Sequence, residues 1–335
     1  MTLFLFWLVI ALAFVFGLTN GFIDGGGLVS TVITTRVLDP LPALLLVAAG
    51  EMVGLYLLGQ QVANTLGHHM ISFPKDTSTI RQLAVLVSAL IGALAWNTTM
   101  WRLALPSSSS HALVGGIAGA FVTAYGRSGI AWPLFWRIFL LLGIVPLAGV
   151  VVGFLLTKIL YWGGQFMTPA VSHVFHAFQV VALAGVALVH GSNDGQKSMA
   201  MMIMAFLALG RSAAPLPNLP WAVYFVCGGA LALGVIFGSR RMIRTLGKRL
   251  YRVQELQGLC AQTSAALLVG ASSLAGYPMS TTQVVSTSVL GSGIAVHPRG
   301  IRWELVWDIM VVWVVTIPAS AAVAALFSYV VSKAL

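Results

Sequence analysis

Charged residues are scarce in this sequence. Asp, Glu, Lys and Arg make up only 8% of its 335 residues, whereas 59% are hydrophobic. About a quarter of the residues of a soluble chain are charged. The composition therefore excludes a soluble globular protein and leaves little room for a soluble domain. It is typical of an all-α polytopic membrane protein, and we expect a multi-pass protein of the cell membrane in contact with lipid.

Cysteine is nearly absent as well. Cys227 and Cys260 are the only two, and both lie in or beside apolar segments. This excludes a disulfide or thiolate-metal framework, so we interpret both as small buried hydrophobic residues.

The net charge of +10 is unevenly distributed, because six of the eighteen basic residues lie within residues 240–252. By the positive-inside rule this cluster predicts a cytoplasmic loop or helix end, with anionic lipid as an additional contact. We do not expect a nucleic-acid partner.

Apolar runs predict about 10–12 membrane segments. They lie near residues 3–19, 41–63, 83–101, 111–125, 132–157, 174–190, 198–210, 221–238, 259–276, 283–296 and 305–331. Several are shorter than the roughly 20 residues that span a bilayer, which predicts broken helices or re-entrant hairpins. The first run lacks a basic start and is followed by Asn20 and Asp24, so we expect a retained helix rather than a signal peptide.

One polar phrase is written twice in this apolar chain. Residues 106–111 read PSSSSH, and residues 278–283 read PMSTTQ. Hydrocarbon offers hydroxyl groups no partner, so both runs should face each other or a wet cavity. If each proline opens a helix, free backbone N–H groups and hydroxyls together form an anion site. The alternative is that Ser107 and Ser280 are ordinary helix caps.

Other features repeat in the same order. Asp24 and Asp194 are 170 residues apart, the two prolines are 172 apart, and residues 54–67 match residues 234–247 at an offset of 180. The second copy of this last match is strongly basic and the first is nearly neutral, which favours inverted topology. We therefore predict two inverted-topology repeats, residues 1–157 and 174–335, joined by a short junction at 158–173, with a site near the bilayer midplane.

Three acidic residues lie within or beside apolar segments: Asp24, Glu51 and Asp194. A lone acid at the bilayer centre costs at least about 2.5 kcal/mol, so each needs a partner, a cation or a proton. Polar residues crowd around Asp194, and Gly191 and Gly195 predict a break in the helix there. Unwound backbone beside carboxylate oxygens is typical of sodium sites, which we consider for Asp24 and Asp194.

The phrase HGSNDGQK at residues 190–197, the two hydroxyl runs, Trp96-Asn97 and residues 244–248 resemble the inorganic phosphate transporter (PiT) family, in its bacterial low-affinity permease form. The resemblance covers nearly the whole chain. It implies a symporter for inorganic phosphate in a bacterial plasma membrane, driven by sodium in some members and protons in others. It also implies a homodimer and no other cofactor.

From the residues and this resemblance together we predict two sets of site residues. The substrate-binding set is Ser108, Ser109, Ser110, Ser280, Thr281, Thr282, Asn193 and Lys197. The cation-binding set is Asp24, Glu51, Asn97, Asp194 and Gln262. Lys197 could be a counter-charge for the anion or a partner of Asp194.

The sequence departs from the family pattern at four positions. Ile23 and Gly27 replace the asparagines of the first signature, Gln262 replaces a glutamate, and Gln283 stands where histidine is common. These changes remove oxygen ligands and a negative charge, so we hypothesise that one cation site is weakened or lost. Water or backbone carbonyls substituting for them is the alternative.

Two other classes of function compete with phosphate symport. A transporter of another tetrahedral oxyanion, such as sulfate or arsenate, is the first, and a passive anion channel is the second. No metal-ligand spacing or Ser-His-Asp order distinguishes a membrane-embedded enzyme, so we expect a protein that is not an enzyme.

Overall fold

The computed structural model describes residues 1–103, 105–164, 172–210, 221–238, 243 and 253–334. Over these residues the secondary structure is helical, apart from a single bridge between Ile71 and Ile130. The basic cluster at 240–252, the phrase at 245–247 and the centre of the junction lie outside the described residues.

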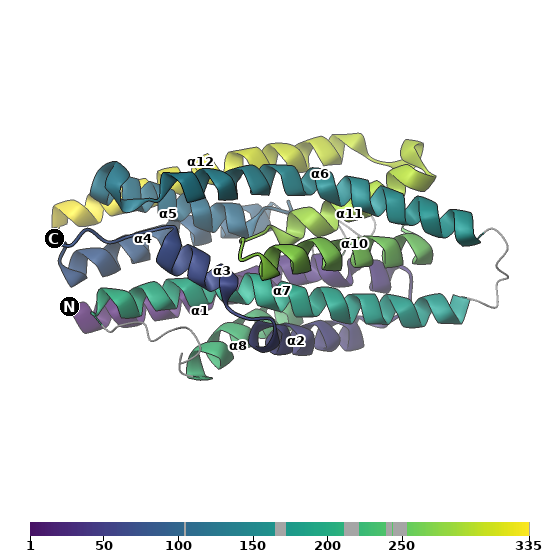
Figure 1. The fold of residues 1–335 in the computed structure, drawn as a ribbon, viewed down its shortest axis with the longest axis horizontal. Coiled ribbons are helices and arrows are strands. Elements are labelled where there is room, and N and C mark those ends of the chain that lie inside the picture. Colours follow the sequence, from purple (N-terminus) through teal and green to yellow (C-terminus); the bar gives the residue numbers. More distant parts are fainter. Residues whose placement is uncertain (104, 165–171, 211–220, 239–242, 244–252, 335) are drawn as a thin grey trace.

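Two series of helices follow one another along the chain (Figure 1). The first comprises α1 (Thr2–Thr34), α2 (Pro40–Leu57), α3 (Gln61–Asn64), a π-helical turn η1 (Thr65–His69), α4 (Thr79–Arg102), α5 (Ser109–Tyr125), η2 (Gly126–Gly129) and α6 (Trp132–Gly163). The second comprises α7 (Ser172–Ala208), α8 (Trp221–Gly238), α10 (Glu255–Leu274), α11 (Thr281–Val296), η7 (Pro298–Gly300) and α12 (Trp303–Ala334).

Seven of the described helices are long and apolar enough to cross a membrane: α1, α2, α4, α6, α7, α8 and α12. Shorter or more polar helices make up the rest, as the short apolar runs predicted. The protein is therefore an all-α, multi-pass membrane protein.

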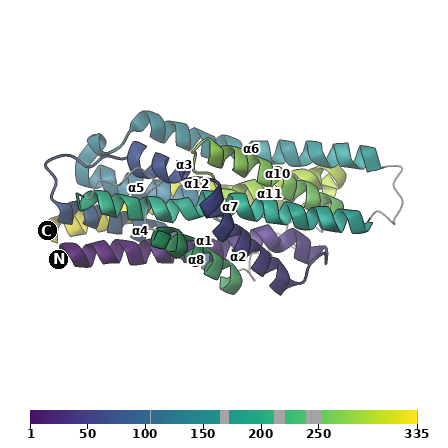
Figure 2. The same cartoon turned by 60° about the horizontal axis from the view of Figure 1, so that its bottom comes forward.

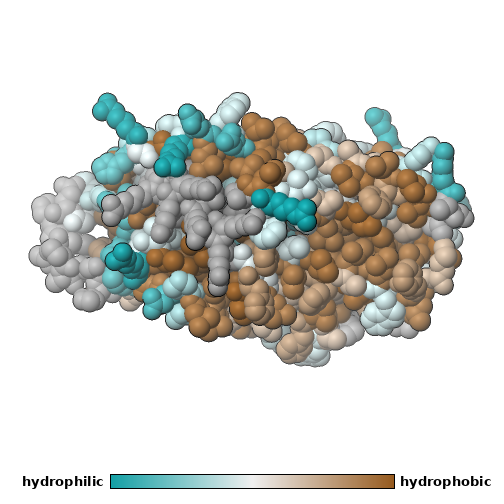
Figure 3. Space-filling view, turned by 180° about the vertical axis from the view of Figure 1, so that it is seen from behind, coloured by the Kyte–Doolittle hydropathy of each residue, from teal (hydrophilic) through white to brown (hydrophobic). Residues whose placement is uncertain are grey.

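Helix α6 shows how the sequence separates lipid from core. Its exposed residues include Trp136, Leu140, Ile144, Leu147, Val151, Leu155 and Ile159. Its buried residues include Phe135, Ile138, Leu142, Val145, Gly149 and Gly153. Both sets recur every three or four positions, so one stripe faces outward and the other packs inward. Figure 3 shows how widely hydrophobic side chains cover one face of the molecule.

The helix packing is the same when the two series are exchanged. Helices α1 and α7 contact each other; α8 packs against α1 and α2 against α7. In the same way α12 packs against α4 and α5, and α6 against α10 and α11. Figures 1 and 2 show the α4–α5 pair and the α10–α11 pair towards opposite ends of the molecule, with the loops between their helices near its middle.

Glycines allow the close helix contacts, and these also repeat. A Cβ atom on Gly54 would lie 1.9 Å from the carbonyl oxygen of Leu188 in α7. A Cβ atom on Gly234 would lie 2.1 Å from the carbonyl oxygen of Leu18 in α1. The offset is 180 between the glycines and 170 between their contacts, as between the sequence features that we matched.

We therefore expect Gly234→Ala to destabilise the protein by about 1–3 kcal/mol, because the added methyl forces α8 away from α1. Gly229→Ala in the same helix is the control, since no atom lies within 4 Å of its added Cβ. Thermal unfolding in detergent measures both. Equal melting temperatures for the two variants would contradict this packing.

The predicted breaks at the two signature phrases are wrong. Helix α1 continues through Asp24 to Thr34, and α7 continues through residues 190–197 to Ala208. The glycines there serve packing instead: a Cβ on Gly191 would lie 2.1 Å from the carbonyl oxygen of Glu51. The side chains of the phrase find partners without unwinding the backbone. Helix α6 also continues past residue 157, into the expected junction.

Candidate functional site

The two hydroxyl runs form the starts of α5 and α11. Ser108 is the N-cap of α5 and accepts a hydrogen bond from the backbone N–H of His111. Ser280 is the N-cap of α11 and accepts one from the N–H of Gln283. The cap interpretation is thus correct for Ser280, and in the first run it applies to Ser108 rather than Ser107. The prolines lie in the preceding loops and do not open the helices, because the hydroxyls cap the free N–H groups instead.

Asp24 joins the two hydroxyl runs. Its carboxylate, only 2% exposed, accepts hydrogen bonds from Ser109 at 3.1 Å and from Thr282. The two donors come from opposite halves of the chain. The runs also meet directly, because the Ser110 hydroxyl donates to the backbone carbonyl of Met279. The expectation that the runs face each other is therefore correct in geometry.

Asp194 has a denser set of partners. Its carboxylate accepts from the Thr281 hydroxyl and from the Asn20 amide, the latter at 3.0 Å, and it forms an ion pair with Lys197. All of these partners except Thr281 lie on the paired helices α1 and α7. Each aspartate thus binds a hydroxyl from its own half, Ser109 for Asp24 and Thr281 for Asp194.

Glu51 and His190 extend the cluster towards α2. The His190 Nδ1 atom lies 2.6 Å from a Glu51 carboxylate oxygen, and its Nε2 atom lies 3.4 Å from an Asp194 oxygen. Ligand atoms of Asp24, His190 and Asp194 all lie within 4.8 Å of one another. The imidazole therefore bridges two carboxylates at the centre of the bundle.

The electrostatics of this cluster follow from its burial. The side chains of Glu51, His190, Asp194 and Lys197 are 0% exposed. Three carboxylates face one ammonium group, so with a neutral His190 the cluster carries a formal charge of −2. Charges in a medium of low dielectric interact strongly, and an uncompensated one is costly. The arrangement therefore favours a bound cation or proton, and a second anion would be repelled until one binds.

Three predicted site residues stand apart from the cluster. Asn193 holds the loop before the second hydroxyl run: it donates to Ser273 and Tyr277 and accepts from the N–H of Met279. Gln262 donates at 3.2 Å to the carbonyl of Leu28 in α1. Asn97 is fully buried, and its amide atoms have no hydrogen-bond partner among the described residues. No printed contact among these residues connects Asn97 or Gln262 to the aspartates.

The sequence interpretation missed Asn20 as a site residue and did not pair His190 with Glu51. A signal existed for Asn20, because it precedes Asp24 by four residues and so shares its helix face. It is also 170 residues before His190, the offset that separates the aspartates. The pairing of His190 with Glu51 joins residues 139 apart and had no sequence signal.

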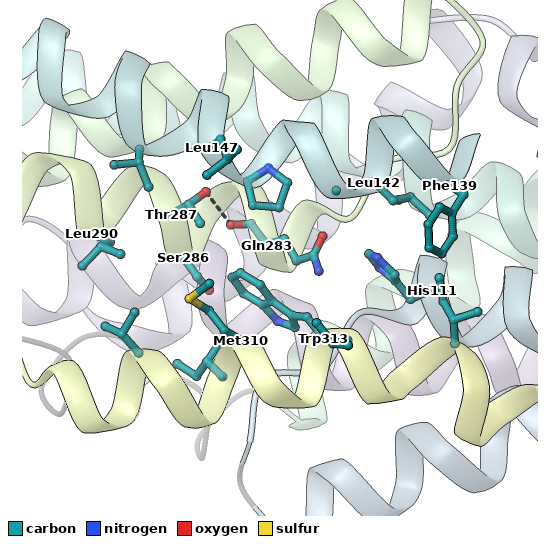
Figure 4. A pocket seen from close by; sticks show the side chains of 17 residues that line it. His111, Phe139, Leu142, Leu147, Gln283, Ser286, Thr287, Leu290, Met310 and Trp313 are labelled. Atoms are coloured by element: carbon teal, nitrogen blue, oxygen red, sulfur yellow. Dashed lines mark hydrogen bonds between the residues drawn. The ribbon is translucent and has the colours of Figure 1, made fainter. Parts of the chain in front are cut away.

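An apolar cavity of about 360 Å³ lies against the outer side of this site. It is lined mainly by α6, α11 and α12, and Figure 4 shows the side chains of His111 and Gln283 turned into it. These are the residues that follow the two hydroxyl runs. Its largely hydrocarbon lining does not suit a multiply charged anion, so the polar cluster, rather than this cavity, is the candidate site.

Comparison with known proteins identifies relatives along the whole chain. The family model described as "Phosphate transporter family" matches residues 20–169 and 164–324. A probable low-affinity inorganic phosphate transporter of Rhizobium meliloti is 34% identical over 95% of this chain and 94% of its own. One from Bacillus subtilis is 31% identical over 97% of this chain and 96% of its own.

A solved structure shares the fold. It is described as "The sodium-dependent phosphate transporter", superposes with a TM-score of 0.89, and is 20% identical, covering 99% of this chain and 100% of its own. At that identity the likeness concerns the fold alone.

These findings agree with the resemblance noted in the sequence and with a transporter rather than an enzyme. The family matches, the relatives and the seven apolar helices identify the chain as a multi-pass protein of the cell membrane. The chain belongs to the phosphate transporter family.

Proposed function

We propose that this protein is a secondary active transporter that imports inorganic phosphate together with sodium ions or protons. The observation that carries the proposal is the convergence of hydroxyls from both halves on two buried carboxylates: Ser109 and Thr282 on Asp24, and Thr281 on Asp194. Hydroxyl and backbone N–H donors at facing helix starts suit a tetrahedral oxyanion. Ser108, Ser110 and Ser280 complete the substrate-binding set.

Hydrogen bonding supplies a reason for coupling. A serine or threonine hydroxyl has a single O–H donor. While Ser109 and Thr282 donate to Asp24, they have no O–H left for phosphate. A cation or proton on Asp24 weakens its hold on both donors and also removes the repulsion of the anion. The two solutes therefore bind better together than apart, which is a coupling free energy.

The proposal includes two inverted repeats, residues 1–157 and 174–335, that place this site near the bilayer midplane. Support comes from the exchangeable helix packing and from the glycine contacts that recur at the sequence offsets. The homodimer and the contact with lipid implied by the resemblance also belong to the proposal.

One cation site is weaker in this chain than in the family pattern. Gln262 offers a neutral amide where the pattern has a carboxylate, and its amide nitrogen is used by Leu28. Its buried amide oxygen has no hydrogen-bond partner among the described residues. A neutral oxygen attracts a cation less than a carboxylate does, so we expect coupling to use fewer sodium ions, or protons.

Uptake by proteoliposomes tests the function. We expect phosphate to accumulate against its gradient when an inward sodium or proton gradient is imposed, and to equilibrate without one. Sulfate and arsenate are added as competitors, each with and without sodium. Accumulation of sulfate in preference to phosphate would assign another oxyanion, and equilibration under every gradient would assign a passive channel.

A further inference from the structure

Lys197 is the only described lysine with a fully buried side chain among the charged groups of the site. Its exposed fraction is 0%, and its ammonium group forms an ion pair with Asp194 and donates at 3.0 Å to the carbonyl oxygen of Met279. Lys197 and Asp194 are three residues apart on α7, and residues at this spacing are neighbours on a helix face. The side chain therefore brings a positive charge to a position between the carboxylate and the loop of the second hydroxyl run.

The matching aspartate has no such partner. Three residues after Asp24 stands Gly27, at the position that corresponds to Lys197 at the offset of 170. Asp24 accepts hydrogen bonds from Ser109 and Thr282, and among the described residues no lysine or arginine forms an ion pair with it. Two carboxylates in equivalent places thus differ in one respect, because only Asp194 is neutralised by the chain itself.

We infer that Lys197 is a tethered cation that takes the place of one co-transported cation at Asp194, so that only Asp24 requires a mobile one. This inference rests on the proposed function. An ammonium group in contact with Asp194 supplies the charge and a hydrogen-bond donor that the carboxylate needs. A sodium ion there would meet a positive charge at contact distance in a medium of low dielectric, which excludes it.

The tether changes the energetics of transport. A covalently attached partner binds at a high effective concentration and is not carried across the membrane. Phosphate binding therefore gains one neutralised carboxylate without consuming an ion gradient. A chain with this lysine couples fewer mobile cations to each phosphate, whatever the coupling ion at Asp24.

Lys197→Gln tests the inference in proteoliposomes. The neutral amide can still donate to Met279 but leaves Asp194 without its cation. We expect phosphate uptake in choline chloride to fall about tenfold or more, and saturating sodium chloride to restore much of it. The ratio of radioactive sodium to phosphate taken up should rise by one ion relative to the wild type.

Two variants control for charge and for substitution. Lys197→Arg retains the positive charge and should keep the sodium response of the wild type. Lys333→Gln removes an exposed lysine at the end of α12 and should behave as the wild type. A Lys197→Gln protein with the wild-type sodium response, or one that folds and stays inactive at every sodium concentration, would overturn the inference.

A binding measurement covers the case in which Lys197→Gln is too unstable to transport. A ligand that binds only the folded state raises the melting temperature. Sodium, compared with choline, should therefore stabilise Lys197→Gln more than it stabilises the wild type, in detergent and without phosphate. Equal stabilisation overturns the inference. A wild type that moves no phosphate under any gradient instead rejects the proposed function, and the sodium measurement remains interpretable.

Discussion

Asp194→Asn is expected to abolish cation-driven phosphate accumulation and to destabilise the protein by about 3–5 kcal/mol, the usual cost of removing one partner of a buried ion pair. The change leaves the ammonium of Lys197 buried without its carboxylate, and it removes the acceptor of the Thr281 and Asn20 hydrogen bonds. Uptake into proteoliposomes measures the first effect. Chemical denaturation in detergent measures the second.

A double variant separates charge from packing. Asp194→Asn combined with Lys197→Gln removes both charges, so much of the lost stability should return although a further side chain has changed. Asp308→Asn, at an exposed position of α12, should leave both quantities unchanged. If the single and double variants are equally stable, the ion pair does not have the role assigned to it.

Ser109→Val and Thr281→Val are each expected to weaken phosphate binding by roughly tenfold to a hundredfold. The reason is the loss of one hydrogen bond to a charged group, which contributes about 1.5–3 kcal/mol. Each variant removes the hydroxyl that donates to the aspartate of its own half. The phosphate concentration at half-maximal uptake measures the effect.

Helix α5 provides the matched control for the hydroxyl variants. Thr123 is exposed and donates at 2.8 Å to the carbonyl oxygen of Gly119 in its own helix. Thr123→Val should therefore leave the phosphate dependence of uptake unchanged. Wild-type uptake by both Ser109→Val and Thr281→Val would contradict the placement of phosphate between the hydroxyl runs.

The membrane class and most helices could be predicted from the sequence because they depend on local properties. Apolar runs of sufficient length are helices in lipid, where the backbone must satisfy its own hydrogen bonds. The serines at 108 and 280 cap helices by local geometry as well. The continuity of α7 through Gly191 and Gly195 was not predictable in this way. Whether a glycine breaks a helix or admits a neighbour depends on the helix packed against it.

The composition of the site was predictable to a similar extent. Asp24, Glu51 and Asp194 could be selected because an acid in an apolar segment needs a partner, and the hydroxyl runs because lipid offers them none. Which partner each acid takes was beyond the sequence. Thr282 reaches Asp24 across 258 residues, and Asn97 and Gln262 have no printed contact with the aspartates among the described residues.

The sequence by itself thus determined that this chain crosses the membrane many times, which polar side chains it carries into the bilayer, and the family it resembles. Hydrophobicity, helix capping and motif spacing are properties of neighbouring residues, and they are legible without a fold. Only the tertiary structure decided that Asp24 binds hydroxyls from both halves while Asp194 is neutralised by Lys197. Such choices are made where separate helices meet, because contact distance and burial set which of several available partners a charge receives.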